Sequence, residues 1–144
     1  MTSAPTHVTP AVARSLEVWH RMIATGDMTE LRDLCRPDAV FRSPMAHRPY
    51  ASADALVLVL TTVSQVFQDF TYHRQLSSDS GLDVMLEFSA TVGGRQLKGV
   101  DLIGFDEDGR IREFEVMVRP MSGLQALGDE MGRRLAHLLP NYSA

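Results

Sequence analysis

Between Leu82 and Ile111 the sequence alternates apolar and polar side chains with a period of two, interrupted by two glycine turns. Alternate side chains on a strand share one face of a sheet, so this stretch predicts strands that are buried on one side only. Gly93-Gly94 is a typical hairpin turn, and Asp108-Gly109 marks the next turn. The chain is therefore constrained to an antiparallel meander with one apolar face.

One carboxyl group breaks the apolar row of the strand that follows the first turn. Asp101 lies in the same row as Leu97, Ile103 and Phe105, whereas the opposite row begins with Gln96 and carries Lys98. Ionisation of a carboxyl group in an apolar interior is costly, so the pKa of Asp101 is expected to be raised. We expect a cavity beside Asp101 as the reason for this arrangement.

Composition excludes several classes of protein. The 144 residues include 44% hydrophobic residues and carry a net charge of −4, which indicates one folded domain. Lys and Arg form no stripe, so we expect no nucleic-acid partner, and the apolar runs are too short for a membrane span. The single cysteine, Cys35, suits a reducing compartment. Residues 1–10 show no export signal, which predicts a cytoplasmic protein.

Capping residues and helical spacing predict four helices. Thr9-Pro10 starts the first helix and Gly26 ends it. Asp27 and Glu30 resemble a capping box for a second, shorter helix. Ser52 caps the third. Apolar residues at helical spacing predict the packed side of the third helix: Leu56, Val59, Leu60, Val63 and Phe67. The same spacing predicts the packed side of the terminal helix: Leu124, Leu127, Met131, Leu135 and Leu138.

Strand signals lie between and after these helices. A short strand is expected at 39–43, and the period switches to two at Phe70, where Phe70, Tyr72 and Leu76 share a face. Helices segregated from an antiparallel sheet make the fold class α+β. We expect a flexible N-terminus at 1–9 and one domain over 10–139, with the terminal helix at about 121–139.

The order and spacing of three short segments resemble the nuclear transport factor 2-like superfamily. These segments are Ala24-Thr25-Gly26-Asp27, Asp38 to Pro44, and Asp101 to Ile111 with its Asp-Gly turn. The superfamily includes SnoaL-like polyketide cyclases, ketosteroid isomerases and limonene epoxide hydrolases. The resemblance implies a cone, in which a curved, mostly antiparallel (mixed) sheet is wrapped by three N-terminal helices around an apolar pocket, with a C-terminal helix added.

The resemblance carries over to the site only in part. Asp101 matches the protonated aspartic acid that binds an enolate oxygen in a similar isomerase. That isomerase's general base falls at Ser43 and its tyrosine donor at Trp19. A serine hydroxyl is too weak a base to remove a carbon-bound proton. The acidic residue that cyclases and epoxide hydrolases carry on the last strand falls at Val116, while Glu115 lies on the other face. Both catalytic sets are thus incomplete.

Asp101 and Tyr72 are the predicted catalytic residues. Asp101 is either the acid of an enzyme or a structural carboxylate paired with a backbone amide or Trp19. The hydroxyl of Tyr72 needs a partner if it is buried, which makes it a candidate second donor. His20 is expected at the periphery. The predicted ligand-binding residues line the inner faces of the elements or the loop after the first strand: Trp19, Phe41, Ser43, Met45, Tyr50, Leu60, Phe88, Phe114 and Val116.

Two functions stay open at this point. One is an isomerase, cyclase, lyase or hydrolase acting on an apolar, cyclic or carbonyl-bearing ligand, with Asp101 as acid. The other is a non-catalytic module that binds a hydrophobic ligand. No metal-ligand spacing and no glycine-rich phosphate loop are present, so no metal and no cofactor are expected. The outer sheet row, which mixes apolar and complementary charged residues, predicts a homodimer: Met85, Glu87, Lys98, Val100, Leu102, Glu113, Glu115 and Met117.

Overall fold

A computed structural model describes residues 7–139 of the chain. Its elements, in chain order, are α1 (Pro10–Thr25), α2 (Leu31–Leu34), β1 (Cys35–Arg42), α3 (Ala53–Val66), β2 (Gln68–Ser77), β3 (Asp83–Val92), β4 (Arg95–Phe105), β5 (Ile111–Arg119) and α4 (Met121–Leu135). The expected flexible N-terminus lies mostly outside these residues.

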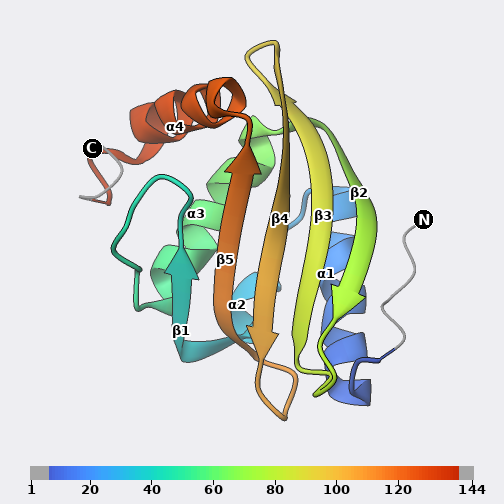
Figure 1. Ribbon diagram of the computed structural model, residues 1–144. Helices are drawn as coiled ribbons and strands as arrows, with labels where there is room; N and C mark the ends of the chain where they lie inside the picture. The colour runs from blue at the N-terminus through green and yellow to red at the C-terminus, as the bar shows by residue number, and fades with distance from the viewer. Residues whose placement is uncertain (1–6, 140–144) are drawn as a thin grey trace.

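The five strands form one mixed, curved sheet in the order β1-β5-β4-β3-β2. β1 runs parallel to β5, and the other neighbours are antiparallel. Figure 1 shows α1, α2 and α3 behind this sheet and α4 across its upper end, and none of residues 7–139 forms a helix on the front face. The predicted α+β class, with a curved sheet wrapped by helices, is confirmed.

Local signals explain where most elements begin and end. The side chain of Thr9 accepts a hydrogen bond from the amide of Val12 at 3.2 Å, and Gly26 ends α1 in the left-handed region at φ 78°. Ser52 caps α3 through the amide of Ala55 at 3.1 Å. Gly93 and Gly94 both have positive φ, as the predicted hairpin turn requires.

The second helix is shorter than the capping-box pattern predicts. Asp27 accepts hydrogen bonds from the amide and the hydroxyl of Thr29, so its side chain closes a turn instead of capping a helix. α2 begins only at Leu31, and Glu30 makes no capping bond. β1 then starts at Cys35, four residues earlier than expected. Cys35 itself is buried.

Two apolar residues predicted to face the core are exposed instead. A register shift between Tyr72 and Gln75 turns the end of β2 over, so Gln75 is half-buried and Leu76 is 48% exposed. At the other end of the chain, α4 stops at Leu135, and Leu138 lies in the following turn with 54% exposure.

Candidate functional site

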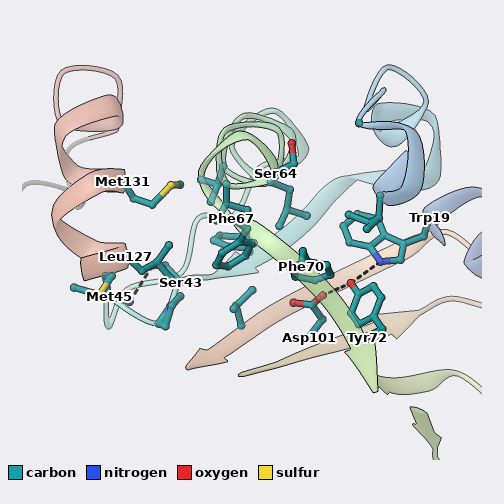
Figure 2. A pocket seen from close by; sticks show the side chains of 18 residues that line it. Trp19, Ser43, Met45, Ser64, Phe67, Phe70, Tyr72, Asp101, Leu127 and Met131 are labelled. Carbon is teal, nitrogen blue, oxygen red and sulfur yellow. Dashed lines mark hydrogen bonds between the residues drawn. The ribbon is translucent and has the colours of Figure 1, made fainter. Parts of the chain in front are cut away.

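A cavity of about 90 Å³ lies between the inner face of the sheet and the helices. Its wall is mostly apolar and is formed by side chains from α1, α3, α4 and the sheet, with the loop after β1 (Figure 2). The lining residues are Trp19, Ile23, Gly26, Phe41, Ser43, Pro44, Met45, Val59, Leu60, Val63, Ser64, Phe67, Phe70, Tyr72, Asp101, Val116, Leu127 and Met131.

Asp101 supplies a carboxyl group to this apolar wall. β4 places it in register with Leu86 of β3 and Val116 of β5, so an apolar side chain flanks it on each neighbouring strand. The residue is only 6% exposed, as the row pattern predicts. The main-chain groups of β4 are already paired within the sheet, so the carboxyl group must find its partners among side chains or a ligand.

A chain of two hydrogen bonds ends at this carboxyl group. The indole Nε1 of Trp19 donates to the hydroxyl oxygen of Tyr72 at 3.0 Å, and that hydroxyl donates to Oδ2 of Asp101 at 2.6 Å. The three residues come from α1, β2 and β4. Figure 2 shows the other carboxyl oxygen of Asp101 pointing away from Tyr72. The hydrogen-bonding capacity of Oδ1 is therefore left for a molecule in the cavity.

Burial dominates the ionisation of this pair. It raises the pKa of Asp101 to about 7, although the hydrogen bond from Tyr72 acts in the opposite direction. Burial and the neighbouring Asp101 together raise the pKa of Tyr72 well above its ordinary value. At neutral pH, Tyr72 thus stays protonated, while Asp101 is present in both its neutral and its ionised form.

Aromatic rings hold the tyrosine in place. The ring of Phe70 meets Tyr72 edge-on at 4.8 Å and stacks on Phe88 at 5.0 Å. His20 contacts the same tyrosine edge-on at 5.4 Å, and its Nε2 lies 3.3 Å from Oε1 of Gln75. His20 is therefore half-buried rather than peripheral, and burial lowers its pKa. These contacts fix the direction of the Tyr72 hydroxyl.

The far end of the cavity is formed by α4 and the loop after β1. Leu127 and Met131 project from α4, and Met45 lies beside them (Figure 2). Met45 packs directly against Gly128, where a Cβ atom would overlap its thioether. Ser43 accepts a hydrogen bond from the amide of Met45 at 3.0 Å, which shapes this loop.

The structure brings together most of the predicted site residues. The predicted residues that line the cavity are Trp19, Phe41, Ser43, Met45, Leu60, Tyr72, Asp101 and Val116. Phe88 and Phe114 do not line the cavity themselves. Phe88 packs against the lining residue Phe70, and Phe114 packs against the lining residue Trp19. Tyr50 is buried and exchanges two backbone hydrogen bonds with Phe41, each of 2.9 Å. His47 and Arg48, in the same loop, are exposed.

Several lining residues were not predicted as site residues. Phe70 shares a strand face with Tyr72. Phe67, which follows the last residue of α3, continues the helical spacing of Leu60, so the same patterns that identified their neighbours also indicated them. The sequence did not indicate that Leu127 and Met131 line the cavity. Helical spacing predicts the packed side of α4, but it does not predict which surface that side packs against.

Charged side chains are scarce at the site. Among the described residues that line the cavity, only Asp101 and Tyr72 are titratable. Across residues 7–139, no three His, Cys, Asp or Glu side chains gather closely enough to hold a metal ion. No helix in this range is both long enough and apolar enough to cross a bilayer. The chemistry that this site offers is thus hydrogen bonding and proton transfer by one carboxyl group.

Comparisons with known proteins place this geometry in a family. Residues 16–114 match the SnoaL-like domain. A protein from Pseudomonas aeruginosa, described as a steroid delta-isomerase, is 61% identical over 94% of this chain and 97% of its own, with a TM-score of 0.89. An uncharacterised protein with a cystatin-like fold from Silicibacter pomeroyi is 36% identical over 91% of this chain and 89% of its own, with a TM-score of 0.78.

More distant structures share the fold alone. A nuclear transport factor 2-like protein of unknown function from Mesorhizobium loti is 17% identical over 83% of this chain and all of its own length, with a TM-score of 0.68. A search of curated proteins found no match.

Proposed function

Because the chain belongs to the SnoaL-like domain family, we propose that its cavity binds an apolar, carbonyl-bearing small molecule and that Asp101 is the acid that acts on the carbonyl oxygen. One observation carries this proposal: the buried carboxyl group of Asp101 accepts a hydrogen bond from the Tyr72 hydroxyl at Oδ2, and its Oδ1 points away from Tyr72 (Figure 2). Because Oδ2 accepts this hydrogen bond, the proton of the neutral acid is on Oδ1. Neutral Asp101 is then a hydrogen-bond donor in an apolar site.

Such a donor stabilises negative charge that develops on a carbonyl oxygen. A hydrogen-bond donor that is already in position, in a site with little water, stabilises the oxygen of the enolate-like state more than the oxygen of the bound ketone. The protein does not have to rearrange when that state forms. Trp19 and Tyr72 have already donated their hydrogens along the chain toward Asp101. Their role is therefore to position the carboxyl group, and Asp101 is the member of this chain of hydrogen bonds that donates to the ligand.

The reaction class is an isomerase-type conversion in which a carbonyl compound passes through its enol. The relative described as a steroid delta-isomerase favours this class. However, Ser43 stands where the resemblance places a carboxylate base, and a serine hydroxyl does not remove a carbon-bound proton unaided. Asp101, whose pKa burial raises to about 7, donates in its neutral form to the carbonyl oxygen. Water or a group of the loop after β1 takes the α-proton and returns a proton to the γ-carbon.

A β,γ-unsaturated cyclohexenone tests this function, because its isomerisation to the conjugated enone changes its absorbance. We expect turnover by the wild type and loss of turnover in Asp101→Leu, which has neither a proton to transfer nor a hydrogen-bond donor. Equal rates for the two proteins would contradict the acid role of Asp101. Asp79→Leu, the same change at an exposed turn position, serves as the control for the substitution itself.

A second candidate function is a binding module that holds a carbonyl compound without converting it. The absence of a second acid or base among the described lining residues favours this alternative. Ligand binding without turnover, weakened by Asp101→Leu, would select the binding module. Binding that is unaffected by Asp101→Leu would contradict both candidates.

The proposal also includes the assembly and the location of the protein. The strand register puts exposed Leu102 and Met117, with Lys98 and the paired carboxylate of Glu87, on the sheet face opposite Asp101. In Figure 1 this is the face turned away from α1, α2 and α3. Apolar residues between opposite charges suit a two-fold, self-complementary contact. We therefore place a homodimer interface on this face, and we place the protein in the cytoplasm.

A further inference from the structure

A second polar side chain shares the cavity floor with Asp101. β1 pairs in parallel with β5, with Arg42 opposite Glu115, and continuing this register by one residue places Ser43 beside Val116. Val116 is in turn the partner of Asp101 on β4. Ser43, Val116 and Asp101 thus form one row across three strands. Two strand spacings of about 4.8 Å separate the outer positions by about 10 Å.

The hydroxyl group of Ser43 is only partly used by the protein. Its oxygen accepts the amide of Met45, and its hydrogen meets no acceptor among residues 7–139. Ser64, the other serine of the wall, differs because it donates its hydrogen to the carbonyl of Thr61 at 2.7 Å. Ser43 is only 8% exposed, and a buried donor without an acceptor costs free energy unless water or a ligand supplies one.

The space between these two groups is apolar. Val116 lies between them on the floor, and Phe67 and Leu60 face the cavity from the α3 side. Figure 2 shows Ser43 beside Met45 and Leu127 at one end, and Asp101 beside Tyr72 and Trp19 at the other. No Lys, Arg or His lines the described wall, so a carboxylate or phosphate bound at the Ser43 end would be an unpaired buried anion.

We infer that the cavity selects ligands with two neutral oxygen acceptors at opposite ends of one ring system, the carbonyl at Asp101 and the second oxygen at the Ser43 hydroxyl. This inference rests on the proposed function and narrows its substrate class. Ser43 is then a residue that determines specificity at the position where the resemblance expects a base. A ligand that lacks the second oxygen leaves the Ser43 hydroxyl unpaired.

Two aryl ketones of nearly equal shape test the inference. In para-methoxyacetophenone an ether oxygen lies opposite the carbonyl, and in para-ethylacetophenone a methylene group replaces that oxygen. Their dissociation constants are measured by titration of the fluorescence of Trp19, the single tryptophan of the chain. One hydrogen bond corresponds to a change of about threefold to tenfold in affinity. We expect Ser43→Ala to reduce the preference for the methoxy compound by that factor.

Two further variants separate hydrogen bonding from altered packing. Ser43→Thr keeps the hydroxyl and should keep the preference for the methoxy compound. Ser64→Ala loses a hydroxyl that already donates to the carbonyl of Thr61, so it should change the affinities for the two ketones by the same factor. Circular dichroism confirms that each variant is folded before its titration.

The outcomes distinguish this inference from the proposed function. If Ser43→Ala keeps the full wild-type preference while Asp101→Leu weakens both ketones, the inference is overturned and the proposed function stands. If the wild type binds neither ketone, the proposed function fails and the inference fails with it.

Discussion

Asp101 combines three features that are rarely found together in one side chain. It is buried between Leu86 and Val116, it accepts a 2.6 Å hydrogen bond from Tyr72, and it faces an apolar cavity. Burial favours the neutral form, and the tyrosine favours the charged form. Because burial is the stronger effect, the carboxyl group is a proton donor at a pH where an exposed aspartate is ionised.

This balance predicts how stability depends on pH. The pKa of Asp101 is about 7 in the folded chain against 3.8 for a free side chain, so the unfolded state releases the proton first as pH rises. The free energy of unfolding of the wild type should fall between pH 4 and pH 7 relative to Asp101→Asn, by roughly 4 kcal/mol at most.

Urea denaturation of both proteins across this range measures the difference. Asp101→Asn keeps the size of the side chain and cannot ionise, so it isolates the contribution of one carboxyl group. A difference that grows in favour of the wild type as pH rises would show that Asp101 is a paired structural carboxylate instead.

Tyr72 should act on the site through the pKa of Asp101. Tyr72→Phe removes the hydrogen bond that stabilises the carboxylate, so the pKa of Asp101 is expected to rise above its wild-type value. Titration of the carboxyl carbon by NMR measures this change directly. Trp19→Phe removes only the hydrogen bond from Trp19 to Tyr72, so it should raise the pKa of Asp101 less than Tyr72→Phe does. A pKa that falls in Tyr72→Phe would contradict this account of the pair.

At the scale of elements, the position of α4 depends on two glycines with different neighbours. A Cβ atom at Gly123 would lie 2.7 Å from the Cβ of Leu97 and 2.9 Å from the carbonyl oxygen of Gln96, which belong to β4. A Cβ at Gly128 would meet the thioether end of Met45, a flexible side chain. The first neighbour is rigid and the second adapts, so the two positions should tolerate substitution differently.

Gly123→Ala is therefore expected to destabilise the protein by about 1–3 kcal/mol, because it forces α4 away from β4. It should also weaken ketone binding, since α4 carries Leu127 and Met131 into the cavity. Gly128→Ala is the matched control, with the same gain in helix propensity and a smaller cost in stability. Thermal unfolding and ketone titration of both variants test this, and equal losses of stability would contradict the proposed difference.

The sequence allows the elements to be predicted where a local cause exists. Thr9, Ser52 and the Gly93-Gly94 turn act on their immediate neighbours, and each places an element boundary as expected. The row of Asp101 follows from strand geometry alone. By contrast, the register shift after Tyr72 arises from pairing with β3, and the contact of α4 with Met45 joins distant segments. These features depend on tertiary packing, which no local pattern contains.

At the scale of the whole molecule, the sheet separates two surfaces with different chemistry. The inner face holds the cavity and one carboxyl group, while the outer face carries ion pairs such as Arg74–Glu87, which hold the pKa of Glu87 at about 2. Arg74 and Lys98 both lie against the buried carboxylate of Glu87, beside exposed Met117. Helices on one face only leave the outer face available for a second copy of the chain.

The proposed dimer should depend on this outer face. Met117→Glu places a charge on an exposed apolar position and repeats it across the two-fold axis, so the dimer is expected to dissociate. Sedimentation equilibrium at micromolar concentration measures the mass of the wild type and of the variant. A monomeric wild type, or a variant that remains dimeric, would contradict the interface. Met121→Glu, an 84% exposed position on α4, provides the control.

The proposed function requires a neutral Asp101 that donates a hydrogen bond to a carbonyl ligand in the cavity. The most direct test is the dissociation constant of para-ethylacetophenone as a function of pH, from pH 5 to pH 9, for the wild type and Asp101→Asn. The account predicts constant wild-type affinity below the pKa of about 7 and weaker binding above it, with no such change in Asp101→Asn. Affinity that is independent of pH, or that increases above pH 7, would contradict the claim.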